Sequence, residues 1–256
     1  MTAVDVSVDE VMAALATVVD PELDEPITDL GFVRSVILDD EGLTVHLRLP
    51  TAFCSPNFAY LMASDAQDAL RLVSESTCVR ILLDDHHDSD KINAGLAADA
   101  GYRGTFGVEA QDSLDELRAV FRRKAHAAAM ERAVEVLLKR TSLEVDGIFA
   151  LTLSDLPAGK EKTALLRRRI GNGLSICPAS RVLVDDDGKP VPREQVPMRL
   201  RFAKSVRISM EGNSHFCRGL LATRYGDSDT EGTGGEVATP RIIDARTTSA
   251  LVRRVS

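Results

Sequence analysis

The sequence LTVHLRLPTAFCSPNFAYLM, residues 43–62, contains a strand, a short loop and the beginning of a helix. In residues 43–49 apolar and polar side chains alternate, which is typical of a strand with one buried face. Ser55 is a favourable N-cap and Pro56 suits the first helical position, and apolar residues then recur at helical spacing. The stretch therefore predicts a strand joined to an amphipathic helix by a loop that contains Cys54.

Further elements are expected on both sides of this stretch. Ser7 and Glu10 form a capping-box pattern before a first amphipathic helix, which Pro21 ends. Residues 32–38 are rich in β-forming residues and lead through a turn into the strand at 43–49, so they predict a hairpin. A third strand is expected over 77–83, reached by a right-handed crossover through the helix. The fold class is therefore α/β (α+β), beginning with a two-layer α-β-β-α-β domain.

The second half of the chain predicts a different organisation. Ser113 and Glu116 repeat the capping-box pattern and predict a long helix from about 113 to 140, which could connect domains or pair two chains. After it we expect a smaller α+β domain, with strands at 148–153, 181–184 and 198–210 and a helix at 159–170. The expected divisions are a domain at 1–105, a long helix or linker at 106–141, a C-terminal α+β domain at 142–226 and a largely flexible tail at 227–256, within which Ile242-Ile243 could dock.

Composition excludes several classes of function. The 256 residues are 44% hydrophobic and 27% charged, as in an ordinary folded protein. A formal charge of −8 disfavours nonspecific nucleic-acid binding, although Arg167-Arg168-Arg169 predicts a local basic surface. No stretch approaches the roughly 20 apolar residues that cross a bilayer, and no export signal is recognised. We expect a cytoplasmic protein that binds neither membranes nor nucleic acid, with four reduced cysteines.

Cys54 is the first candidate for chemistry. Its place at the beginning of a helix puts its sulfur near unpaired backbone N–H groups and the positive end of the helix dipole. These features are expected to lower the thiol pKa below the usual value of about 8.5, and a thiolate binds metals or attacks electrophiles. The alternative is a small buried residue without chemical function.

Several short motifs together resemble the metal-sulfur cluster biosynthetic family of small α/β domains. They cover roughly residues 5–100 and comprise Asp20-Pro21-Glu22, Ile27 with Asp29-Leu30-Gly31, Thr51 and Cys54. Phe53 and Ser55 flank the cysteine here, whereas many family members have Gly before it and Pro after it. Members act as accessory factors in iron–sulfur protein maturation, and one branch accompanies phenylacetyl-CoA oxygenase.

The resemblance implies a noncatalytic factor that helps to install an iron or iron–sulfur centre in a client metalloenzyme, with a multicomponent monooxygenase as one candidate. Cys54 would hold iron or a cluster transiently, with Asp20, Glu22, Asp29 and Thr51 as further binding residues. For the three acidic residues, capping of local turns is the structural alternative. The implied partners are the client or other iron–sulfur assembly proteins, and a homodimer would let two copies of Cys54 share a cluster.

Two other groups of residues could bind a metal. If residues 215–217 are extended, His215 and Cys217 face the same side, and with Cys177 they would suit zinc or iron, with Cys54 as a fourth ligand. The alternative is a helix in which Cys217 packs inward. His86 and His87, beside Asp88 and Asp90, could also bind a metal, but their spacing fits no particular metal template and favours a solvated surface loop. A zinc- or iron-dependent enzyme and a metal-free structural adaptor are therefore the competing hypotheses.

Overall fold

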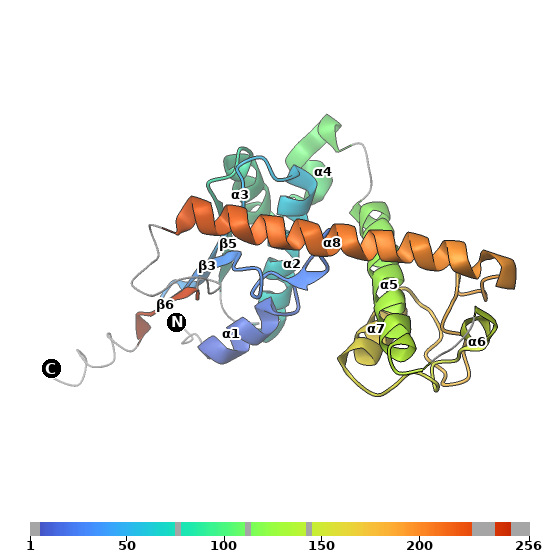
Figure 1. Ribbon diagram of the computed structural model, residues 1–256. Coiled ribbons are helices and arrows are strands. Elements are labelled where there is room, and N and C mark those ends of the chain that lie inside the picture. Colours follow the sequence, from blue (N-terminus) through green and yellow to red (C-terminus); the bar gives the residue numbers. More distant parts are fainter. Residues whose placement is uncertain (1–5, 75–77, 111–113, 142–144, 227–238, 247–256) are drawn as a thin grey trace, which may run out of the picture. The chain divides into compact units, whose positions relative to one another are not determined.

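The computed structural model describes residues 6–74, 78–110, 114–141, 145–226 and 239–246 (Figure 1). The chain forms two compact units. Unit one comprises Met1–Leu114 and Ser214–Ser256, and unit two comprises Asp115–Asn213. Residues 214–226, expected in the C-terminal domain, thus group with the N-terminal one, while most of the expected flexible tail lies outside the described residues.

Unit one is built on a four-stranded sheet with strand order β5-β4-β3-β6. The strands are β3 (Val33–Asp39), β4 (Gly42–Arg48), β5 (Val79–Asp84) and β6 (Arg241–Asp244). β3 and β4 form the expected antiparallel hairpin. β5 pairs in parallel with β4, and the chain between these two strands contains a helix. β6 pairs in parallel with β3, with Val36 opposite Ile242, so the expected docking of Ile242-Ile243 is confirmed.

Helices complete unit one. α1 (Val8–Leu15) begins with the expected capping box, in which the Glu10 amide donates to Ser7 Oγ and the Ser7 amide donates to Glu10 Oε2. α2 (Pro56–Val73) packs against α1 and β5, and α3 (Ser89–Ala97) packs against β5 and α4 (Gly101–Phe106). A 3-10 turn, Gly107–Glu109, follows α4, and a two-stranded ribbon of β1 (Val19–Asp20) and β2 (Glu25–Pro26) follows α1. The mixed α/β class is confirmed.

Unit two is mainly helical. It contains α6 (Val145–Ala150), α7 (Lys160–Gly171) and the 3-10 turn Arg193–Gln195, together with most of α5 (Leu114–Leu138) and α8 (Val196–Tyr225). The long helix expected at 113–140 and the helix at 159–170 are confirmed. Its core is formed by apolar side chains of these helices and of the segment 151–191.

The strands expected at 148–153 and 198–210 are wrong. The first range overlaps α6 and then makes an isolated bridge between Thr152 and Arg181, and the second lies within α8. In α8 the residues that pack inward are Val196, Leu200 and Ala203, at helical spacing. Burial of this face therefore prevails over the β propensity of the valine and isoleucine residues that follow.

Candidate functional site

Cys54 lies in the loop between β4 and α2, directly before the N-cap residue Ser55. Its side chain is partly exposed and packs at the margin of the unit-one core. Thr51 Oγ1 accepts a hydrogen bond from the Phe53 amide at 3.1 Å and lies 3.6 Å from Cys54 Sγ. Phe53 projects outward with 82% of its surface exposed. The sulfur therefore stands at the beginning of a helix, as expected, and is accessible from the surface.

The loop after β5 holds the Cys54 loop in place. Because the Asp88 amide donates to His86 Nδ1 at 3.0 Å, that nitrogen is unprotonated and the ring proton lies on Nε2. His86 Nε2 then donates to the Cys54 carbonyl at 2.8 Å, and the His87 amide donates to the Ala52 carbonyl at 2.9 Å. Both nitrogens of buried His86 are engaged within the protein, so metal binding there would break one of these bonds.

Asp20 stabilises the turn between β1 and β2. Its Oδ1 accepts hydrogen bonds from the amides of Glu22 and Leu23, each at 2.9 Å, which is the capping role considered as the alternative for this residue. The side chain is buried, and this burial raises the pKa of its carboxyl from 3.8 to about 6 despite the two bonds. Asp29, by contrast, is exposed and contacts Thr28.

The last turns of α8 pack on this part of unit one. Ser214 Oγ donates to Glu25 Oε1 at 2.6 Å, and Arg218 pairs with the same carboxylate. Leu221, one turn further along, lies in the unit-one core. Arg224 then donates to the carbonyls of Leu49 and Asp85. The helix therefore contacts the β1–β2 ribbon and both segments that support the Cys54 loop.

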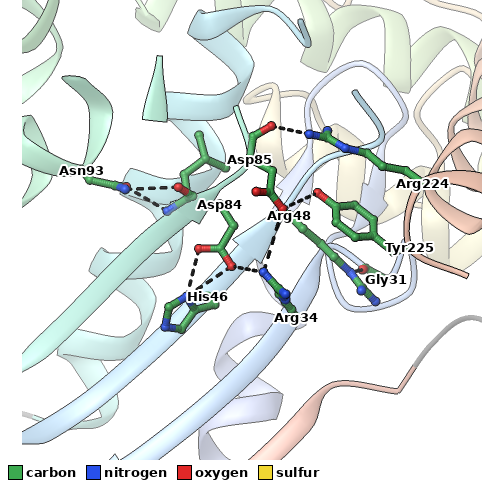
Figure 2. Close-up of polar contacts among 10 residues, drawn as sticks. Gly31, Arg34, His46, Arg48, Asp84, Asp85, Asn93, Arg224 and Tyr225 are labelled. Carbon is green, nitrogen blue, oxygen red and sulfur yellow. Dashed lines mark hydrogen bonds and ion pairs between the residues drawn. The ribbon is translucent and has the colours of Figure 1, made fainter. Parts of the chain in front are cut away.

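A polar network at the ends of the central strands anchors this contact (Figure 2). Tyr225 donates to Asp85 Oδ2 at 3.2 Å, and its ring lies 4.9 Å from the guanidinium of buried Arg48. Asp84 accepts from Arg34 at 2.9 Å and contacts His46 Nδ1 at 3.0 Å. These contacts fix the end of β5, from which the His86 loop departs.

Cys217 lies on the face of α8 that packs on unit one. Like Cys54, it is partly buried against the unit-one core. Burial raises the pKa of its thiol to about 11, and the negative charges of Asp20, Cys54 and Glu22 act in the same direction. Such electrostatic effects require proximity, so the two cysteines and two carboxylates occupy one neighbourhood.

The sequence contained a signal for this neighbourhood that was missed. Ser214, Cys217, Leu221 and Arg224 recur at helical spacing, which favours the helix over the extended alternative for residues 215–217. The extended alternative is wrong and the helical one is confirmed: in α8, residues two apart point about 200° apart, so His215 is exposed while Cys217 packs inward. Cys177 is exposed and belongs to unit two. Among the described residues, no group of three or more His, Cys, Asp or Glu side chains is arranged to hold a metal ion.

Comparison with known proteins identifies the class of this domain. Residues 8–82 match the family model described as "Iron-sulfur cluster assembly protein". The uncharacterized protein MJ1129 of Methanocaldococcus jannaschii is 33% identical over 92 residues, which cover 36% of this chain and 95% of that protein. No solved structure matches the chain significantly.

The chain therefore belongs, through the N-terminal part of unit one, to the iron–sulfur cluster assembly protein family. This confirms the resemblance found in the sequence and indicates a role in iron–sulfur cluster assembly, with partners in that process. In the described ranges, no helix has both the length and the apolar character that crossing a membrane requires.

Proposed function

We propose that this protein is a noncatalytic accessory factor that assists the assembly or insertion of an iron or iron–sulfur centre in a client metalloenzyme. Cys54 serves as a transient ligand of the metal or cluster that is delivered. The observation that carries this proposal is the partly exposed sulfur at the start of α2, in a domain of the iron–sulfur assembly family.

Cys217 is the second sulfur donor in this proposal: burial keeps it a thiol at neutral pH, and metal binding would release its proton. Thiolates are soft ligands that suit iron, iron–sulfur clusters and zinc, and the nearby carboxylates of Asp20 and Glu22 add harder oxygen donors. A cluster normally takes four protein ligands, so two sulfurs leave positions for a donor, a client or a second copy of the chain. Incomplete ligation suits a factor that must release its cargo.

The client is proposed by analogy with the family branch that accompanies an oxygenase. A multicomponent monooxygenase contains iron centres of the kind that such a factor would help to assemble or insert. The proposal includes a homodimer in which each of the two chains contributes its Cys54 to one cluster.

The test compares two single cysteine substitutions in the producing cell. Cys54→Ser removes the proposed ligand, and Cys78→Ser makes the same change at a cysteine that is exposed just before β5. Each variant replaces the native gene, and the iron and acid-labile sulfide content of purified client enzymes is measured. We expect Cys54→Ser to resemble a deletion, Cys78→Ser to resemble the wild type and Cys217→Ser to show a partial loss.

Anaerobic titration of purified protein with ferrous iron provides the second measurement. Thiolate-to-iron charge-transfer absorption should appear in wild type and in Cys78→Ser, and should be much weaker in Cys54→Ser, which keeps only the Cys217 sulfur. Full client metal content in cells that carry Cys54→Ser at wild-type protein level would contradict the proposed role of this cysteine.

A further inference from the structure

Unit two contains a buried arginine that forms no ion pair with any residue the structure describes. Arg169, near the end of α7, has 1% of its surface exposed, so it does not belong to the basic surface expected for residues 167–169. Its Nη1 donates to the Arg181 carbonyl at 2.9 Å, and its Nε is buried with no hydrogen-bond partner in the described part of the chain. A buried cation without a carboxylate partner is costly, and burial lowers its pKa accordingly.

A second guanidinium with an unused donor lies at the beginning of α8. Arg199 Nη2 donates to Asp186 Oδ1 at 2.9 Å, while its Nε is buried and, within the described residues, has no partner. Asp186 also pairs with Arg123 Nε at 3.7 Å. Two guanidinium groups, those of Arg123 and Arg199, therefore share the Asp186 carboxylate.

The third unused nitrogen belongs to His126 on α5. The residue is 2% exposed, and among the described residues its Nε2 has no partner. Burial lowers the pKa of its ring to about 4, and the charges of Arg169 and Arg199 lower it further, whereas Asp186 opposes them. The ring is therefore neutral at pH 7 and able to donate one hydrogen bond.

Hydrogen bonds and ion pairs between the elements place these three residues in one region of unit two. Asn172 Nδ2 donates to the Arg122 carbonyl at 3.1 Å and so holds the end of α7 on α5. Arg169 lies about one turn before Asn172, and His126 about one turn after Arg122. The pairing of Asp186 with both Arg123 and Arg199 ties α8 to the same turn of α5.

We propose that His126, Arg169 and Arg199 form a binding site within unit two for a small oxyanion such as inorganic phosphate or sulfate. Arginine recognises such anions through charge-assisted hydrogen bonds, and the unused Nε–H groups of Arg169 and Arg199 supply donors for them. An anion would also neutralise the excess positive charge. The near-complete burial of His126 and Arg169 favours an anion of a few atoms over a large phosphorylated ligand.

Isothermal titration of the full chain with inorganic phosphate, at constant ionic strength in chloride, tests this site. Arg169→Gln removes the buried charge, and Arg167→Gln makes the same change on the exposed side of α7. We expect wild type and Arg167→Gln to bind equally and Arg169→Gln to bind at least about tenfold more weakly. Arg199→Lys keeps the charge beside Asp186 but removes the Nε donor, and should also weaken binding. This second variant keeps the proposal testable if Arg169→Gln does not fold.

Hydrogen exchange separates binding at this site from a purely structural role. Phosphate should increase amide protection in α5 and α7 of wild type and should not do so in Arg169→Gln. The proposal is overturned if phosphate and sulfate both fail to bind wild type. It is also overturned if Arg167→Gln weakens binding as much as Arg169→Gln, because the effect would then arise from general surface charge.

Discussion

Replacing Asp20 by Asn should stabilise unit one at neutral and alkaline pH. The amide oxygen of Asn can accept the same two backbone hydrogen bonds from Glu22 and Leu23, while the buried negative charge is removed. Raising a carboxyl pKa from 3.8 to about 6 means that ionised Asp20 costs the folded state about 3 kcal/mol. Asp20→Asn removes this cost, but the neutral amide oxygen accepts weaker hydrogen bonds, which reduces the expected gain in stability by about 1 kcal/mol.

The sign of the pH dependence follows from the raised pKa. The folded state binds the Asp20 proton more tightly than the unfolded state, so this contribution to stability is fully present below pH 3.8. It is lost progressively as the pH rises to about 6 and is absent above that. The gain from Asp20→Asn should therefore be about 2 kcal/mol at pH 8 and should disappear near pH 4.

Urea unfolding followed by tyrosine fluorescence measures this difference. The chain lacks tryptophan, and its three tyrosines, Tyr60, Tyr102 and Tyr225, all belong to unit one, so the signal reports on that unit. Asp29→Asn is the matched control, because Asp29 is exposed, and its effect should differ little between the two pH values. An effect of Asp20→Asn that is the same at pH 4 and pH 8 would refute the assigned burial penalty.

Three further substitutions test packing inside unit one or inside unit two. Gly42→Ala should destabilise unit one by more than about 2 kcal/mol in the same urea assay. Gly42 has φ +146°, and an added Cβ would lie 2.2 Å from the Cys78 carbonyl oxygen, whereas Gly219→Ala in α8 meets no atom within 4 Å and should be tolerated. Leu221→Ala should cost about 2–5 kcal/mol and reduce amide protection in the last turns of α8, because it empties part of the unit-one core; unchanged protection would contradict this packing. Glu131→Gln removes a carboxylate that pairs with Arg207 where both side chains are largely buried. It should therefore lower the free energy of unfolding of unit two by about 1–3 kcal/mol and lower the melting temperature measured by circular dichroism. A raised melting temperature would show that this ion pair is not stabilising.

Local sequence patterns were sufficient for most of unit one. The capping box at Ser7, the alternation in residues 43–49 and the Ser55-Pro56 helix start each specify an element through interactions within a few residues. Parallel pairing of β5 with β4 then follows from the crossover helix between them. The position of Cys54 at the start of α2 could be predicted for the same reason.

Helical spacing at Ser214, Cys217, Leu221 and Arg224 indicates a helix there, but where that helix packs could not be predicted from such patterns. The β-rich run at 198–210 predicts a strand, whereas residues 196–225 form one helix that buries Val196 and Ala203 in unit two and Leu221 in unit one. That helix brings Cys217 near Cys54, which is more than 160 positions earlier in the sequence.

The sequence by itself determined the family, the order of elements up to residue 84 and the cysteine at the start of α2, because each depends on short-range spacing. Tertiary structure decided which distant residues lie close enough to affect each other's charge. In unit one Asp20 and Glu22 affect Cys217, and in unit two Arg169 affects His126. The physical reason is that burial and charge pairing depend on how helices pack, which no local pattern encodes.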